Sequence, residues 1–148
     1  MSLRKLLRVT AVLEAGAGVA CLLVPRLVVE LLFGPASATQ LEAVLVRFIG
    51  AALLSLGMAC WWAAEDPESR AAEGVVKAML LYDVGAAVLL VYAGASGLTG
   101  IVLWLAVAVH SAMAVWCIVG PPTCREQALA AETERAALKE QSYGLSSR

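Results

Sequence analysis

The sequence predicts an all-α integral membrane protein in which four helices form an up-down bundle. First, 61% of its 148 residues are hydrophobic and 16% are charged, whereas soluble domains are about half apolar and about a quarter charged. Second, the apolar residues are gathered in four blocks, each close to the roughly 20 residues that cross a bilayer as a helix. Third, the connections between the blocks are short, which favours antiparallel neighbours.

Each block is bounded by residues that interrupt or end a helix. Pro25 closes the first block. The run from 27 to 33 is too short to cross a membrane and predicts a short interfacial helix, which Gly34 and Pro35 end. An acidic loop at 65–70 follows the second block, and Gly-Pro-Pro at 120–122 ends the fourth. The expected spans are about 6–24, 41–64, 75–95 and 98–119.

The predicted membrane domain comprises residues 1–120, and residues 121–148 form a tail. The tail is rich in Ala, Glu, Arg and Leu from Arg125 to Gln141, so we expect a solvated cytoplasmic helix there. The first block has the outline of a secretory signal, with basic residues before an apolar run. Glu14 in the middle of that run argues against a signal, so we interpret the block as a retained first span.

The distribution of positive charge predicts the orientation. With four spans, most basic residues fall on one side, and the loops of the other side contain Arg26 alone. The positive-inside rule places the basic side, with both termini, in the cytoplasm, and we expect a multi-pass protein of the cell inner (cytoplasmic) membrane. Tryptophans should mark the inner interface as an aromatic belt. The basic residues on the predicted inner side are Arg4, Lys5, Arg8, Arg70, Lys77, Arg125, Arg135, Lys139 and Arg148, and the tryptophans are Trp61, Trp62 and Trp116.

Each predicted span carries one ionisable residue: Glu14, Arg47, Asp83 or His110. A charge at the centre of a membrane helix costs about 2.5–3.5 kcal/mol, so such residues tend to face the interior and pair. Small residues flank each of them at helical spacing, which indicates an inward face. We expect one polar layer with Arg47 as the hub for the carboxylates, although Arg47 could instead snorkel to the interface. Tyr82, beside Asp83, is a further candidate ligand-binding residue or fills the bundle.

Two interpretations of this layer remain open from the sequence. In one, the layer binds a lipophilic or quinone-like small molecule, because intramembrane ionisable residues are functional candidates by default. In the other, the charges only fix the packing of the helices, and the protein is a structural or assembly subunit of a membrane complex. A transporter is disfavoured, because we find no internal repeat and no broken helix at the expected midplane. The small-residue faces are compatible with a homodimer or a larger membrane complex.

Several chemistries lack their usual signatures. The net charge is −1 and there is no basic patch with interleaved aromatics, so we do not expect a nucleic-acid partner. The four cysteines form no C-x-x-C, and the hydrolase, zinc-protease and P-loop motifs are missing, so no reaction is assigned. His110, Met113 and Cys117 lie on one side of the fourth span, a weak pattern for Cu(I) or haem. Met and Cys are also ordinary core residues, and we expect neither copper nor haem; a bound quinone or lipid is the more plausible ligand.

The arrangement resembles the small bacterial four-helix membrane proteins grouped as DoxX-like. The resemblance rests on Pro25 after the first span, on Leu-Val-Arg-Phe-Ile-Gly at 45–50, on Tyr82-Asp83, and on the stretch from Leu103-Trp104 to His110. It covers about residues 6–119 and implies a four-helix membrane fold. Members are mostly of unknown function, and some are linked to quinone or sulfur redox chemistry. The resemblance therefore implies a protein that is accessory to a redox system, without assigning any residue a catalytic role.

Overall fold

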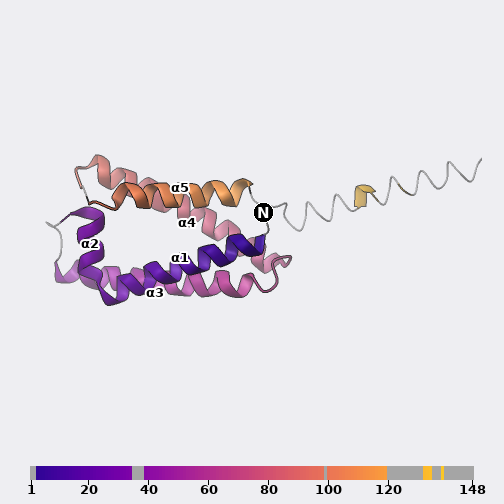
Figure 1. The fold of residues 1–148 in the computed structure, drawn as a ribbon, viewed down its shortest axis with the longest axis horizontal. Coiled ribbons are helices and arrows are strands. Elements are labelled where there is room, and N and C mark those ends of the chain that lie inside the picture. The colour runs from indigo at the N-terminus through magenta and orange to yellow at the C-terminus, as the bar shows by residue number, and fades with distance from the viewer. Residues whose placement is uncertain (1–2, 35–38, 99, 120–131, 135–137, 139–148) are drawn as a thin grey trace, which may run out of the picture.

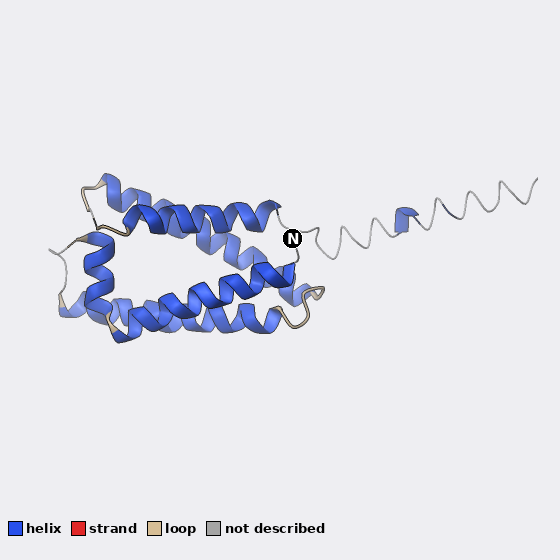
Figure 2. Cartoon of the chain, in the orientation of Figure 1, coloured by secondary structure: helices blue, strands red, loops and turns tan. Residues whose placement is uncertain are grey.

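The computed structural model describes residues 3–34, 39–98, 100–119, 132–134 and 138. Within these ranges the chain forms helices joined by turns, with no strand, which confirms the predicted all-α class (Figure 2). The helices are α1 (Leu3–Leu23), α2 (Pro25–Phe33), α3 (Gln40–Ala63), α4 (Arg70–Ala95) and α5 (Leu103–Val119). Most of the predicted tail helix lies outside the described residues, although 132–134 and 138 are helical.

The four longer helices run up and down as two pairs (Figure 1). α1 packs mainly against α3, and α4 packs mainly against α5. The short helix α2 lies across one end of the bundle, where it contacts α1, α3 and α5. α5 ends at the same end of the bundle at which α1 begins (Figure 1).

Three of these helices, α1, α3 and α4, are long and apolar enough to cross a membrane. This supports the predicted membrane protein. The fourth predicted span, 98–119, is shorter than expected: α5 has 17 residues and a length of roughly 26 Å. The difference arises from two glycines. Gly97 has a φ of 92°, and Gly100 lies directly against the backbone of Leu31 and Leu32, so this stretch forms a connection rather than helix.

Close backbone contact holds α1 against α3. A Cβ added to Gly18 would lie 2.8 Å from the carbonyl oxygen of Gly50, and one added to Gly50 would lie 2.8 Å from that of Gly18. At Gly57 the added atom would meet the backbone of Ala11 at 3.0 Å. Small residues allow membrane helices to approach in this way. The small-residue faces predicted for the first two spans therefore form a real interface.

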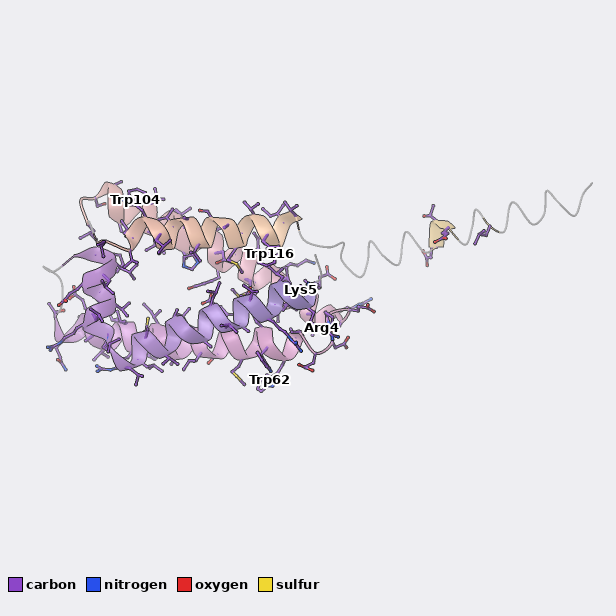
Figure 3. The ribbon with its side chains drawn as sticks, viewed as in Figure 1. Arg4, Lys5, Trp62, Trp104 and Trp116 are labelled. Atoms are coloured by element: carbon purple, nitrogen blue, oxygen red, sulfur yellow. The ribbon has the colours of Figure 1, made fainter. Side chains whose placement is uncertain are left out.

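A core cluster joins the two pairs at the end that contains the chain start. Its fully buried members come from α1, from the end of α3 and from the first half of α4, and Cys117 of α5 packs against them. Arg4, Lys5, Trp62 and Trp116 lie toward this same end, and Trp104 lies toward the other (Figure 3). The described residues thus show the association of basic and indole side chains that the sequence predicts. The buried members of the cluster are Leu7, Ala11, Cys60, Ala64, Ala72 and Met79.

Candidate functional site

The clearest polar contact inside the bundle joins α4 to α5. Oδ1 of Asp83 and Nδ1 of His110 are 2.8 Å apart, and Asp83 is only 1% exposed. When Asp83 is ionised, the Nδ1–H of His110 donates this hydrogen bond, because a carboxylate can only accept. That arrangement fixes the imidazole tautomer and leaves Nε2 as the second reactive nitrogen. The interhelical pair is therefore a built polar centre at the middle of α4 and α5.

The second carboxylate oxygen of Asp83 has no partner. Oδ2 is buried, and no hydrogen-bond donor among the described residues reaches it. A buried acceptor without a partner loses its hydration without compensation, which costs about 1–3 kcal/mol, and more for a charged group. Buried polar groups are nearly always satisfied, so such an exception indicates a group that acquires its partner from elsewhere. Among the described residues, Oδ2 therefore keeps its full capacity to accept a hydrogen bond.

Tyr82 borders the same pair. Its ring meets the imidazole of His110 edge to face, with centroids 5.5 Å apart and planes 80° apart. This is a favourable aromatic geometry. The phenol also packs against the core cluster, so Tyr82 both fills the bundle and adds a polar tip next to His110. The predicted proximity of Tyr82 to this layer is present.

Glu14 faces the pair from the other half of the bundle. It is 7% exposed on α1 and lies within electrostatic range of His110 and Asp83, although no ion pair joins them. Thr10, four residues earlier on the same face, is 2% exposed. Sequence reasoning did not single out Thr10, although its i−4 spacing from Glu14 was a usable signal. The predicted inward facing of Glu14, Asp83 and His110 thus agrees with their burial.

Arg47 is not the hub of this layer, and that expectation was wrong. Its side chain is exposed and forms no ion pair with a carboxylate in the described part of the chain. Instead its Nε–H donates to the carbonyl oxygen of Leu22 at 3.3 Å. The physical reason is that helix α1 ends close to Arg47. α1 ends at Leu23, so its last carbonyl groups, including that of Leu22, need donors from outside the helix, and a guanidinium is a good one.

The cysteines contribute packing rather than a recognisable centre. Cys21, Cys60 and Cys117 are free thiols, and Cys60 is buried in the core cluster beside Cys117. Within the described residues, no group of three or more His, Cys, Asp or Glu side chains is arranged to hold a metal ion. Cys124 lies outside the described residues. The chemistry of the interior is thus carried by oxygen and imidazole groups.

Comparisons with protein-family models, with curated proteins and with solved structures found no match. The resemblance to DoxX-like proteins therefore stays an expectation from the residues quoted above. The function has to be argued from the geometry of Asp83, His110, Tyr82 and Glu14. These residues supply an unpaired acceptor, an imidazole, an aromatic edge and a second carboxyl group within one membrane bundle.

Proposed function

We propose that the protein binds a lipophilic small molecule with a polar, hydrogen-bonding head, of the quinone type, at the Asp83–His110 pair. One observation carries the proposal: Oδ2 of Asp83 is buried, and none of the described residues donates a hydrogen bond to it. The hydroxyl of a quinol can donate to that oxygen, and the Tyr82 edge suits a flat ring. Ligand sites of this kind are mostly apolar with a few convergent polar groups, and they occur between the helices of bundles.

The proposed setting is a bacterial inner membrane, with α5 as a short fourth span and both termini in the cytoplasm. The basic residues and tryptophans at the α1 start support this orientation. A span of 17 residues lies at the lower limit for crossing, and local thinning of the bilayer accommodates it. In this setting the protein would act beside a redox system of DoxX-like type, delivering or retaining its lipophilic ligand.

A second candidate function is structural. The Asp83–His110 hydrogen bond joins α4 and α5, which already pack closely together. Such a pair can fix the register of two helices without any ligand. The protein would then be an assembly subunit of a membrane complex. This candidate predicts that changes at Asp83 alter the stability of the bundle and nothing else.

Binding of a soluble quinone analogue separates the two functions. The full chain in lipid nanodiscs is titrated under anaerobic, reducing conditions with decylubiquinol, the reduced form that carries the donating hydroxyls, and wild type is compared with Asp83→Asn. We expect saturable binding to wild type and about tenfold weaker binding to the variant, because a hydrogen bond to a charged group contributes at least about 1.4 kcal/mol. The matched control is Glu73→Gln on the same helix. Glu73 forms a salt bridge with Lys77 near the start of α4, away from the proposed site.

The result that would contradict ligand binding is equally definite. If wild type shows no saturable binding, and Asp83→Asn only lowers the thermal midpoint, the structural function replaces the proposed one. If Glu73→Gln weakens binding as much as Asp83→Asn, the ligand is not held at the Asp83–His110 pair.

A further inference from the structure

A separate open cavity lies at the other end of the bundle, where α1 ends, α2 begins and α3 starts. It has a volume of about 430 Å³. Its polar lining is Arg26, Gln40 and Arg47, and its apolar lining includes Leu23, Leu27 and Ala43. It is built from the chain turn around Pro25 and does not include any residue of the Asp83–His110 pair. Its chemistry is therefore independent of the proposed ligand site.

The two guanidinium groups in this cavity have no acidic partner among the residues that the structure describes. Neither Arg26 nor Arg47 forms an ion pair with any described acid, and Glu30, one turn beyond Arg26, does not reach it. Glu42 is already engaged, because its carboxylate accepts from the backbone N–H of Thr39 at 2.6 Å. A guanidinium has five N–H donors, and Arg47 uses its Nε–H for the carbonyl oxygen of Leu22. Two cations with free donors therefore share one cavity.

The backbone around the cavity contributes partial charges of both signs. α2 begins at Pro25, which has no N–H, and its N-cap residue Val24 supplies no side-chain cap. The N-terminal ends of α3 and α4 differ from that of α2, because the side-chain oxygens of Thr39 and Ser69 cap them. An uncapped helix start carries a partial positive charge that favours anions. The start of α2 therefore has the same sign as the charges of Arg26 and Arg47, whereas the last carbonyl groups of α1, at the same turn, have the opposite sign, and the Nε–H of Arg47 donates to one of them. The positive potential of the cavity thus comes from the two guanidinium groups.

The position of the cavity selects the kind of anion. It opens at the ends of α1 and α3, which are candidate membrane spans. Arg47 lies seven residues after the first residue of α3, Gln40, or roughly 10 Å along the helix. An unpaired Arg near the hydrocarbon boundary is costly unless a counter-charge reaches it. Apolar side chains continue outward from the cavity, and Leu23, Val44 and Phe48 are exposed on that surface.

We propose that this cavity binds the head group of an anionic phospholipid. The phosphate would accept from Arg26 and Arg47, since arginine binds phosphate through paired N–H groups. Gln40 would contact the glycerol part, and the acyl chains would lie along the exposed apolar surface of α1 and α3. Basic pockets between membrane helices on the cytoplasmic side bind anionic lipid head groups in this way, and this cavity has the same two elements, paired cations and adjoining apolar helices, at the opposite end of the bundle. The lipid would also stabilise the turn between α1 and α2.

Lipid retention in native mass spectrometry tests this site. The full chain in a neutral detergent is titrated with phosphatidylglycerol or with phosphatidylcholine of the same acyl chains. We expect phosphatidylglycerol to bind about tenfold more tightly. Arg26→Gln should remove about tenfold of that affinity, and Arg47→Lys should remove a smaller part, because lysine keeps the charge but loses the planar donor fork.

The control keeps the same change of charge at the opposite end of the bundle. Arg70→Gln alters the exposed first residue of α4 and should leave phosphatidylglycerol binding unchanged. Glycerol 3-phosphate is added as a soluble competitor and should not displace the lipid. Helical circular dichroism shows whether each variant is folded; if Arg26→Gln is not, the loss in Arg47→Lys decides.

Three results would each overturn the proposal. The first is equal retention of the two lipids by wild type. The second is an equal effect of Arg26→Gln and Arg70→Gln, which would indicate general charge attraction. The third is displacement of the lipid by glycerol 3-phosphate at a comparable concentration, which would assign the cavity to a soluble phosphate instead.

Discussion

The two helix pairs of this protein are held together by different means. α1 and α3 meet through backbone contact at Gly18 and Gly50, whereas α4 and α5 are joined by the hydrogen bond between Asp83 and His110. Lipid provides no hydrophobic drive between helices, so packing and interhelical hydrogen bonds must supply the association. The α1–α3 interface depends mainly on backbone packing, and one hydrogen bond from Arg47 to the carbonyl oxygen of Leu22 joins the two helices at the end of α1. The α4–α5 interface instead contains a polar pair at the middle of both helices, and this difference is why we propose a functional site at α4–α5 rather than at α1–α3.

The largest effect we predict is at the α1–α3 interface. Gly50→Leu should lower the free energy of unfolding by about 3 kcal/mol, because its Cβ would lie 2.8 Å from the Gly18 carbonyl and the helices must separate. The matched control is Gly16→Leu on α1, where an added Cβ meets nothing within 4 Å. Leucine is the better helix former by up to about 1 kcal/mol, so the control should be neutral or stabilising. Thermal unfolding in detergent measures both.

If Gly50→Leu were as mild as Gly16→Leu, the α1–α3 contact would not be a packing interface. The contrast between the two pairs would then disappear, because both would depend on something other than close backbone approach. The proposed difference between the two helix pairs would therefore be contradicted if both variants kept the stability of wild type.

The second prediction concerns the polar pair. A double-mutant cycle with Asp83→Ala and His110→Ala should give a coupling of about 1 kcal/mol, since interhelical hydrogen bonds in membrane proteins contribute about 0.6–1.7 kcal/mol. Each single variant should cost more than the coupling itself, because it leaves one buried polar partner alone. Unfolding free energies of wild type, both single variants and the double variant complete the measurement. Additive effects would show that the 2.8 Å contact contributes no specific attraction.

The outcome at these two interfaces also shows what the sequence could specify. Helical spacing correctly predicted that Glu14, Asp83 and His110 face inward, because small residues repeat on the same face as each of them. It could not predict which of them would pair. The distance between Asp83 and His110 depends on the rotation and depth of α5, and α5 begins later than expected because Gly97 and Gly100 form the connection.

Arg47 shows the limit of depth arguments most clearly. Counting residues along the helix predicted a depth close to that of Glu14 and Asp83. In the structure, α1 ends just before Pro25, and the carbonyl groups at its C-terminal end lie beside Arg47. A nearby carbonyl at Leu22 requires no long reach of the side chain and no burial of the guanidinium. Arg47 therefore contacts the nearby Leu22 carbonyl instead of a distant carboxylate. This contact depends on the fold of the α1–α2 turn, which the sequence does not reveal. The membrane class, by contrast, followed directly from composition and span length.

The smallest effect we predict is at the charged contact of the α1–α3 pair. Arg8 and Glu65 approach to 3.6 Å with side chains 50% and 63% exposed, and Arg8 also lies 5.9 Å from the centre of the Trp61 ring. Exposed ion pairs contribute about 0–1 kcal/mol and are screened by salt. A cycle with Arg8→Ala and Glu65→Ala should therefore give a coupling below about 0.5 kcal/mol.

That coupling should vanish at high salt, because the Debye length falls to about 3 Å at 1 M. The Asp83–His110 coupling should survive the same salt, since water and ions do not reach a buried pair. A coupling at Arg8–Glu65 larger than that of Asp83–His110 would show that surface charge, rather than backbone contact, holds α1 to the α3 end.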